Sequence, residues 1–303
     1  KLSHDYKFFV DNNVDTKDIS GWDWKKDIKL DKPPNGSFWV YTRDNAHNNV
    51  EFFNTGAQWQ SILRNIKNLR SIKATGGETT LTAGFKEFID HAIETRACDK
   101  MFLEFHTNAT KFTDTLVDKL VQFPACRMNF SIDSIAENYE YIRYPMKFDA
   151  LQNSINNLFA KADAKRKDFK LSIILVSVFS VYNAHYLYDL YNWWKYFIRP
   201  RVSKHSFYVD KLWPDDKFTS VKFLGKKQKL EILDVLHKIQ NDGIVDVDNI
   251  IKHVEDELDR KILDTDRRNM LKEITVFDKS RNQNYKDFLH PSIIEYLETP
   301  IEV

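Results

Sequence analysis

The chain has 303 residues, of which 42% are hydrophobic, a length that suits one large α/β domain or a domain with an appendage. Its 45 Lys and Arg residues against 44 Asp and Glu residues give a formal net charge of +1, so charge alone gives no reason to expect nucleic acid or an anionic membrane as a partner. The longest apolar stretch, 171–179, is broken by serines and too short to span a bilayer, and the N-terminus does not resemble a signal peptide.

Residues 1–57 show little hydrophobic periodicity and carry a Pro-Pro and an Asn-Gly pair. We expect a loop-rich insertion here, in which residues 38–42 and 50–53 form a hairpin.

Helix and strand patterns alternate from Gln58 onward, with strands roughly every 30–40 residues. This spacing is typical of repeated β/α units and a parallel sheet. The patterns predict helices at 58–69, 81–95, 113–122, up to 164 and 185–197, and strands at 70–74, 101–106, 127–132, 170–178 and 206–209.

Charged amphipathic helices follow Pro214, at 225–240, 247–258 and 265–276. The predicted organisation is therefore an insertion (1–57), a β/α core (58–213) and a helical C-terminal extension (214–303).

Polar residues follow each predicted strand, and function in parallel β/α folds collects at the carboxyl ends of strands. Each residue also has a local explanation, because Asn, Asp and Ser often cap turns and helices and a Gly pair often forms a tight turn. Both interpretations stay open residue by residue, but repetition at every strand end favours a small-molecule site. In chain order the residues are Thr75, Gly76, Gly77 and Glu78; His106, Thr107 and Asn108; Ser131 and Asp133; Ser180 and Asn183; and Asp210, before Trp213 and Pro214.

Cys98 and Cys126 are the only cysteines and lie far apart, without a CxxC spacing. We expect buried thiols in a reducing, cytoplasmic compartment, and no metal ligands among them. The nine histidines show no convincing ligand spacing, and for His106 a structural role is expected.

The motifs TGGETT, TNAT and SIDS, each after a predicted strand, and the following YEYIRYPMKFD resemble the radical S-adenosylmethionine superfamily. The resemblance spans about residues 58–297, and its C-terminal part looks like the twitch-domain radical proteins of phages and marine bacteria. It implies a partial (β/α)6 TIM-like barrel whose N-terminal strand is missing. Thr79 stands where relatives often carry proline.

The resemblance also implies roles for individual residues. The backbone of Gly76 and Gly77 and the carboxylate of Glu78 would receive the methionine amino group of S-adenosylmethionine, since a carboxylate pairs well with a ligand ammonium, and Thr75 belongs to the same cofactor-binding motif. Arg143 would clamp the ligand carboxylate, with a surface ion pair as the alternative. Ser131 and Asp133 would face the ribose or methionine part, and Thr107, Asn108 and Asn183 would line the crevice.

The family's CxxxCxxC motif, which holds a [4Fe–4S] cluster, does not occur in this sequence. The expected explanation is truncation before Lys1, with the cluster ligands in the full-length protein only. That protein would cleave S-adenosylmethionine to a 5′-deoxyadenosyl radical, using an electron donor, and abstract hydrogen from a substrate such as a peptide.

The alternative is a cluster-less, non-catalytic relative that serves as a binding or interaction module. An aromatic helix, 186–197, is a candidate partner surface, although a packed core explains it better. The sequence lacks the G-x-S-x-G, P-loop and G-x-G-x-x-G motifs, which argues against an α/β hydrolase or a nucleotide binder.

Overall fold

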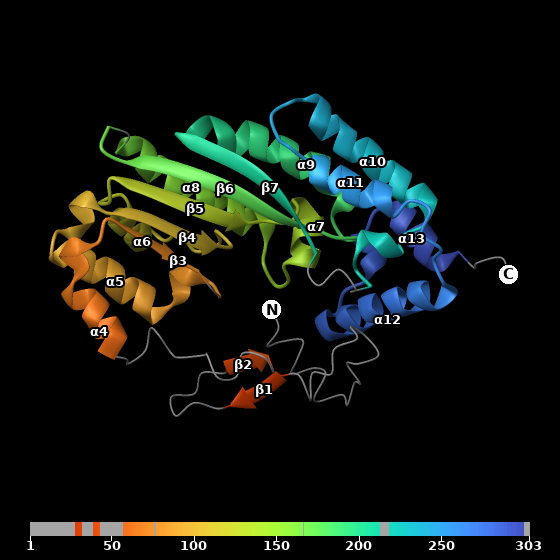
Figure 1. Ribbon diagram of the computed structural model, residues 1–303, viewed down its shortest axis with the longest axis horizontal. Helices are drawn as coiled ribbons and strands as arrows, with labels where there is room; N and C mark the ends of the chain where they lie inside the picture. The colour runs from red at the N-terminus through yellow and green to blue at the C-terminus, as the bar shows by residue number, and fades with distance from the viewer. Residues whose placement is uncertain are drawn as a thin grey trace.

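A five-stranded parallel sheet forms the centre of the molecule (Figure 1). The computed structural model describes residues 28–31, 39–42, 57–75, 77–165, 167–212 and 218–299. The strand order follows the chain, as expected when each strand is joined to the next through a crossover helix. This confirms the α/β class and a partial TIM-like arrangement, with strands β3 (Ser71–Ala74), β4 (Phe102–Thr107), β5 (Ala125–Ser131), β6 (Lys170–Phe179) and β7 (Lys204–Lys211).

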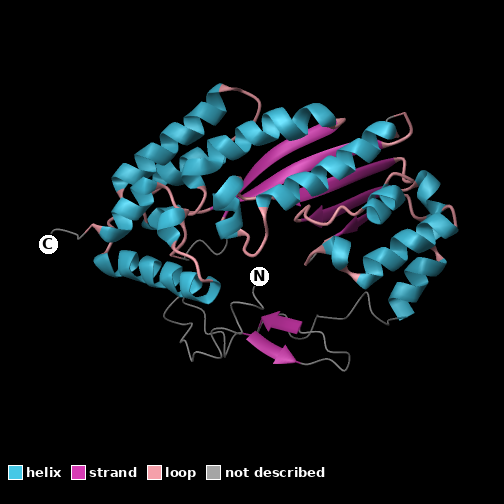
Figure 2. Cartoon of the chain, turned by 180° about the vertical axis from the view of Figure 1, so that it is seen from behind, coloured by secondary structure: helices cyan, strands magenta, loops and turns pink. Residues whose placement is uncertain are grey.

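Helices cover one face of the sheet: they lie behind it in Figure 1 and in front of it in Figure 2, the opposite view. Most begin within a few residues of their predicted positions, and Thr82 and Thr113 cap two of them through their hydroxyls. The helices are α4 (Ala57–Arg64), α5 (Ala83–Glu94), α6 (Asp114–Leu120), α7 (Ala136–Ile142), α8 (Phe148–Ala164) and α9 (Leu187–Trp193), then α10 (Lys226–Asn241), α11 (Asp248–Asp256), α12 (Asp264–Arg281) and α13 (Pro291–Glu298).

The two faces of the sheet differ in chemistry because successive side chains alternate across a strand. Toward the helices, Leu103 and Phe105 of β4 and Met128 of β5 are fully buried. On the other face Glu104 accepts from both Lys73 (3.0 Å) and Arg127 (3.3 Å). The sheet therefore has one apolar face in the core and one face that carries partly exposed charged side chains.

The N-terminal region contains a short antiparallel pair, β1 (Ile28–Asp31) and β2 (Trp39–Thr42). The predicted strand at 38–42 is present, but its partner is β1. Residues 50–53, the predicted partner, lie outside the described residues.

Buried polar contacts bind the C-terminal helices to the core. The hydroxyl of Tyr141 in α7 donates to Asp278 of α12 (2.8 Å), and the same carboxylate accepts from the backbone N–H of Tyr285 (2.6 Å). Asn138 of α7 donates to the carbonyls of Tyr182 and Phe288, both at 3.0 Å. These contacts hold the helical extension beside the loop that follows β6.

Helix α13 was not predicted from the sequence, although Pro291 at its first turn is a typical start signal. The division between core and extension at residue 214 stays a prediction, because residues 213–217 lie outside the described part of the chain.

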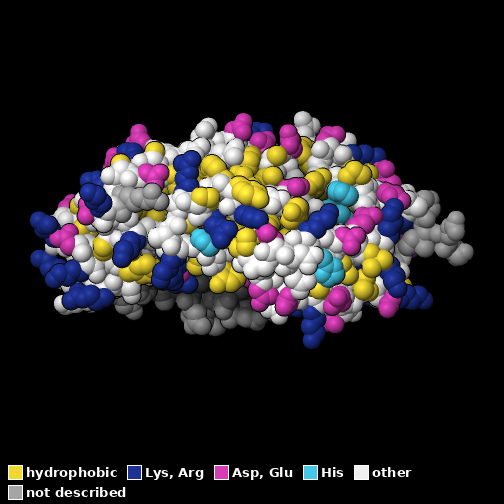
Figure 3. Space-filling view, turned by 90° about the horizontal axis from the view of Figure 1, so that it is seen from above, with side chains coloured by type: hydrophobic (Ala, Val, Ile, Leu, Met, Phe, Trp, Pro, Cys, Tyr) yellow, Lys and Arg dark blue, Asp and Glu magenta, His cyan; other side chains and the backbone are white. Residues whose placement is uncertain are grey.

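Acidic, basic and apolar side chains are interspersed on the face seen in Figure 3, in keeping with the balanced composition. Among the described residues, no helix combines the length and the apolar character needed to cross a membrane.

A buried lysine in α10 predicts an unusual dependence of stability on alkaline pH. Lys229 is 1% exposed, its ammonium donates to the carbonyl of Glu257 (2.6 Å), and burial lowers its pKa to about 8. The unfolded chain keeps this proton to about pH 10.4, so stability rises as the pH rises above 8.

We expect urea denaturation to give about 2 kcal/mol more stability at pH 9.5 than at pH 7.5, relative to the Lys229→Met variant measured at the same two pH values. Lys238→Met, an exposed lysine of the same helix, is the matched control and should show the wild-type difference. An equal pH response in wild type and Lys229→Met would refute the assignment.

Candidate functional site

The carboxyl ends of β3 and β4 are joined through the carboxylate of Glu78, which follows β3. Its Oε1 accepts from the hydroxyls of Thr80 and Thr107, both at 2.6 Å, and from the backbone N–H of Thr80 at 3.3 Å. Its Oε2 accepts from the backbone N–H of Asn108 at 2.7 Å. We call these four residues the Glu78 cluster; they come from two strand ends that the sequence placed on one edge of the sheet.

The local backbone explains why Glu78 lies there. Gly77 has φ +48°, in the left-handed region that glycine adopts without steric cost, and its neighbourhood is open. Glu78 then caps the short 3-10 helix Thr79–Leu81 through its side chain. Thr75 is exposed, and Gly76 lies outside the described residues.

Asn108 contributes its backbone rather than its side chain. Its Oδ1 accepts from the N–H and the hydroxyl of Thr110, at 3.0 and 2.6 Å, which is the turn-capping role that was its alternative interpretation.

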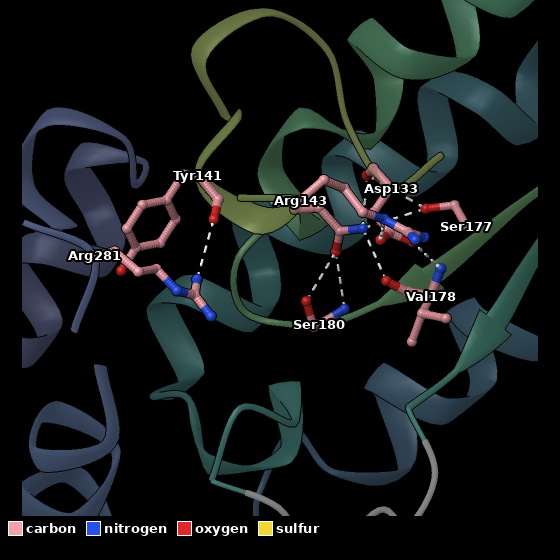
Figure 4. A network of polar contacts seen from close by, with 8 residues as sticks. Asp133, Tyr141, Arg143, Ser177, Val178, Ser180 and Arg281 are labelled. Carbon is pink, nitrogen blue, oxygen red and sulfur yellow. Dashed lines mark hydrogen bonds and ion pairs between the residues drawn. The ribbon is translucent and has the colours of Figure 1, made fainter. Parts of the chain in front are cut away.

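A second group of polar residues joins the ends of β5 and β6. Asp133 accepts from Arg143 Nε at 2.6 Å and from the backbone N–H of Val178 at 2.9 Å (Figure 4). The side chains of Asp133 and Arg143 are 9% and 22% exposed, so the ion pair is mostly buried but reachable. Because the pair uses Nε, the two terminal nitrogens of Arg143 have no protein partner within the described residues.

Asn183 fixes the geometry of this second group. It is fully buried, and its amide nitrogen donates to the carbonyls of Asp133 (2.8 Å) and Val178 (2.9 Å) and to the Ser177 hydroxyl (3.2 Å). Its Oδ1 accepts from Ser180 N at 2.9 Å. We call Asp133, Arg143, Ser177, Ser180 and Asn183 the Asp133 cluster.

Tyr139, a residue that sequence reasoning did not select, is buried and feels the charges of residues in both clusters. Burial raises its pKa to about 12; Arg143 opposes this rise, while Asp133 and Glu78 add to it. The phenol therefore lies within electrostatic reach of both carboxylates. Its hydroxyl is buried and has no hydrogen-bond partner in the part of the chain that the structure describes, as is also true of the hydroxyls of Thr79 and Ser134. Such orphaned groups are costly and indicate a place where a ligand completes the hydrogen bonding.

The remaining predicted residues lie outside the two clusters. Ser131, the last residue of β5, is half-buried, and its hydroxyl makes no hydrogen bond to the described residues. His106 is half-buried within β4, and Asp210 is exposed within β7. Trp213 and Pro214 lie outside the described residues.

The two cysteines are buried and free, as predicted. Cys98 lies just before β4 and Cys126 near the start of β5, so both are at the amino ends of strands, away from the two clusters. Burial raises the pKa of both thiols, Asp99 adding to the effect at Cys98. They lack the spacing and the thiolate character of cluster ligands.

No family model matches the sequence, and no curated protein matches it. Solved structures with a partly similar arrangement were found. SuiB of Streptococcus suis bound to S-adenosylmethionine has a TM-score of 0.41 and 13% identity, over 61% of this chain and 40% of that one. anSMEcpe with bound AdoMet has a TM-score of 0.42 and 16% identity, over 70% and 57%.

Both proteins were also solved with peptides: SuiB with the precursor peptide SuiA (TM-score 0.39, 13% identity) and anSMEcpe with AdoMet and the Cp18Cys peptide (TM-score 0.41, 14% identity). The first of these matches covers 61% of this chain and 39% of SuiB, and the second 70% of this chain and 56% of anSMEcpe. The chain thus spans about two fifths to three fifths of the length of these proteins.

Proposed function

We propose that the chain binds S-adenosylmethionine at the carboxyl edge of the sheet and recognises its methionyl group as a zwitterion. One observation carries the proposal: at the carboxyl edge of the sheet, Glu78 has a carboxylate oxygen with room for a further donor, and Arg143 has terminal nitrogens without a partner among the described residues. An α-amino acid group carries the complementary charges, an ammonium and a carboxylate.

The ammonium would bind Glu78. A carboxylate has about four lone-pair positions. Oε1 is saturated by three donors, whereas Oε2 accepts, among the described residues, only from Asn108 N and can take one more. A charge-assisted hydrogen bond from an ammonium is stronger than a neutral one, so this oxygen favours an amino group.

The ligand carboxylate would bind Arg143. Asp133 holds the guanidinium by Nε and fixes its plane, which leaves the two terminal nitrogens for a forked contact. Ser131 is the last residue of β5, and its hydroxyl makes no hydrogen bond to the described residues. We propose that this hydroxyl contacts the ribose hydroxyls of the ligand. Thr107 and Asn183 position these groups rather than touch the ligand.

The [4Fe–4S] cluster that the sequence resemblance implies does not fit the cysteines of this chain, for the reasons of position and burial given above. We therefore assign ligand binding to these residues and derive no radical step from them. The electron donor and the cytoplasmic location expected from the resemblance stay predictions. A cluster-less relative that keeps ligand binding is the alternative function, and burial of the two thiols is compatible with either proposal.

A polar substrate would face the open side of the sheet. Lys73, Glu104 and Arg127 form an ion-pair group on that side, and His106 and Asn129 lie next to it in register. Such a surface offers many hydrogen-bonding groups, and we propose a peptide as the substrate class.

Isothermal titration of the chain with S-adenosylmethionine tests the proposal, with Glu78→Gln as the variant. Glutamine keeps the size of the side chain but presents a neutral amide to the ammonium, so we expect about a tenfold to hundredfold loss of affinity. 5′-Methylthioadenosine lacks the amino-acid group and should bind wild type and variant equally weakly.

Glu87→Gln is the matched control. Glu87 is an exposed glutamate of α5, and it accepts a hydrogen bond from the indole of Trp59 (2.8 Å). The Glu87→Gln variant should bind S-adenosylmethionine with the affinity of the wild type. Circular dichroism of Glu78→Gln must show a folded protein. The proposal fails if the wild type does not bind at ~1 mM ligand, or if folded Glu78→Gln binds as well as the wild type.

A further inference from the structure

Two histidines and a glutamate from distant parts of the chain converge beyond the loop that follows β6. His185 lies in the short 3-10 helix Ala184–Tyr186, Glu231 in the second turn of α10, and His290 at the N-cap of α13. One potential ligand atom of each lies within 4.8 Å of those of the other two, and no other group of this kind occurs in the described residues.

The contacts within this trio leave donor atoms available. His185 Nε2 lies 3.2 Å from Glu231 Oε2, close to the roughly 3.3 Å that separates two ligands of a tetrahedral ion with 2.0 Å bonds. Nδ1 of His290 accepts from the backbone N–H of Ser292 (3.3 Å), so Nε2 is the nitrogen free to bind an ion.

The site is partly enclosed by the protein. The side chain of His185 is 3% exposed, so an ion bound at its Nε2 would be largely shielded from bulk water.

One lysine lies near the trio. Lys227, one turn before Glu231 on α10, forms an exposed ion pair with Glu295 of α13 at 2.7 Å, which directs its ammonium to a carboxylate outside the trio. The rings of His185 and His290 stack at 4.2 Å with 8° between their planes. Because an ion lies in the plane of each imidazole that binds it, the His290 ring must tilt when the ion enters.

We propose that His185, Glu231 and His290 form a binding site for a divalent transition-metal ion of the Zn²⁺ type. Two neutral imidazoles and one carboxylate are a donor set that suits Zn²⁺, with water completing the coordination. The site joins the loop after β6 to helices α10 and α13. A bound ion therefore fastens the helical extension to the core, close to the Asp133 cluster, and this inference stands apart from the proposed ligand binding.

Zinc titration of chelator-treated protein tests the site, with the metal alone as the probe. We expect one Zn²⁺ per chain and a higher melting temperature with zinc than with a chelator. Substitution by Co²⁺ should give the strong visible absorption of a low-symmetry four-coordinate site. Glu231→Gln and His290→Asn should each weaken zinc binding at least tenfold; asparagine keeps a side chain that can cap α13.

His237→Asn is the matched control, since His237 lies on the same helix, α10, outside the trio, and should bind zinc as the wild type does. Metal-free melting temperatures separate loss of binding from loss of folding. The site is refuted if the wild type binds no stoichiometric zinc, or if folded Glu231→Gln and His290→Asn keep the wild-type affinity.

Discussion

Replacing Asn183 by alanine should lower the free energy of unfolding by about 3 kcal/mol. The side chain is fully buried and makes hydrogen bonds to the backbone of Asp133, Val178 and Ser180. Alanine can neither donate nor accept, and the contacts with Asp133 and Ser180 are buried, so these backbone groups lose their partner without gaining water. The cost of leaving them unpaired is larger than the value of the bonds themselves. Urea denaturation measures the effect.

Asn192→Ala is the matched control. Asn192 lies on α9, is partly exposed and makes no side-chain hydrogen bond to the described residues, so its replacement should change stability by less than about 0.5 kcal/mol. A loss below ~1 kcal/mol in Asn183→Ala would mean that water replaces the amide and that the Asp133 cluster is held by other contacts.

Arg143→Lys should reduce the affinity for S-adenosylmethionine by about tenfold to hundredfold. Lysine retains the charge and can still pair with Asp133, but an ammonium cannot contact Asp133 and fork to a ligand carboxylate at the same time. Isothermal titration gives the affinities. Decarboxylated S-adenosylmethionine, which lacks the carboxylate, should bind wild type and Arg143→Lys with equal affinity.

The comparison between the two ligands distinguishes direct contact from a structural role, because a collapsed site would weaken both. Arg260→Lys serves as the control variant, since Arg260 forms an exposed ion pair with Glu257 in the helical extension. It should bind both ligands as the wild type does. Equal losses for the two ligands in Arg143→Lys would overturn the assignment of Arg143 to the carboxylate.

Local patterns predicted the core well. The strands β3 to β7 lie within a few residues of their predicted positions because each is an apolar run bounded by turn residues, and a buried parallel strand needs that signal. The pairing of β2 with β1 was not predicted, since pairing between strands depends on tertiary context that a short run does not encode, and the pairing with residues 50–53 stays a prediction. Helix α13 was missed because eight residues carry little periodicity.

The candidate site was predicted in part. Glu78, Asp133 and Asn183 were selected at strand ends and Arg143 through the family resemblance, and the structure brings the four into two clusters. Tyr139 was passed over because an aromatic residue on a short helix looks like core, and only its orphaned hydroxyl and charged surroundings distinguish it. The trio of His185, Glu231 and His290 had no sequence signal, since its members are separated by 46 and 59 residues.

By itself, the sequence determined the class of fold, the chain order of the strands and the edge of the sheet at which polar residues gather. These features depend on hydrophobic periodicity and turn chemistry, which act over a few residues. Only the tertiary structure decided which polar groups share partners, which nitrogens of Arg143 stay free, and that α10 and α13 bring Glu231 and His290 to His185. Those properties depend on side chains packed across long sequence separations, where burial sets the cost of every unpaired group.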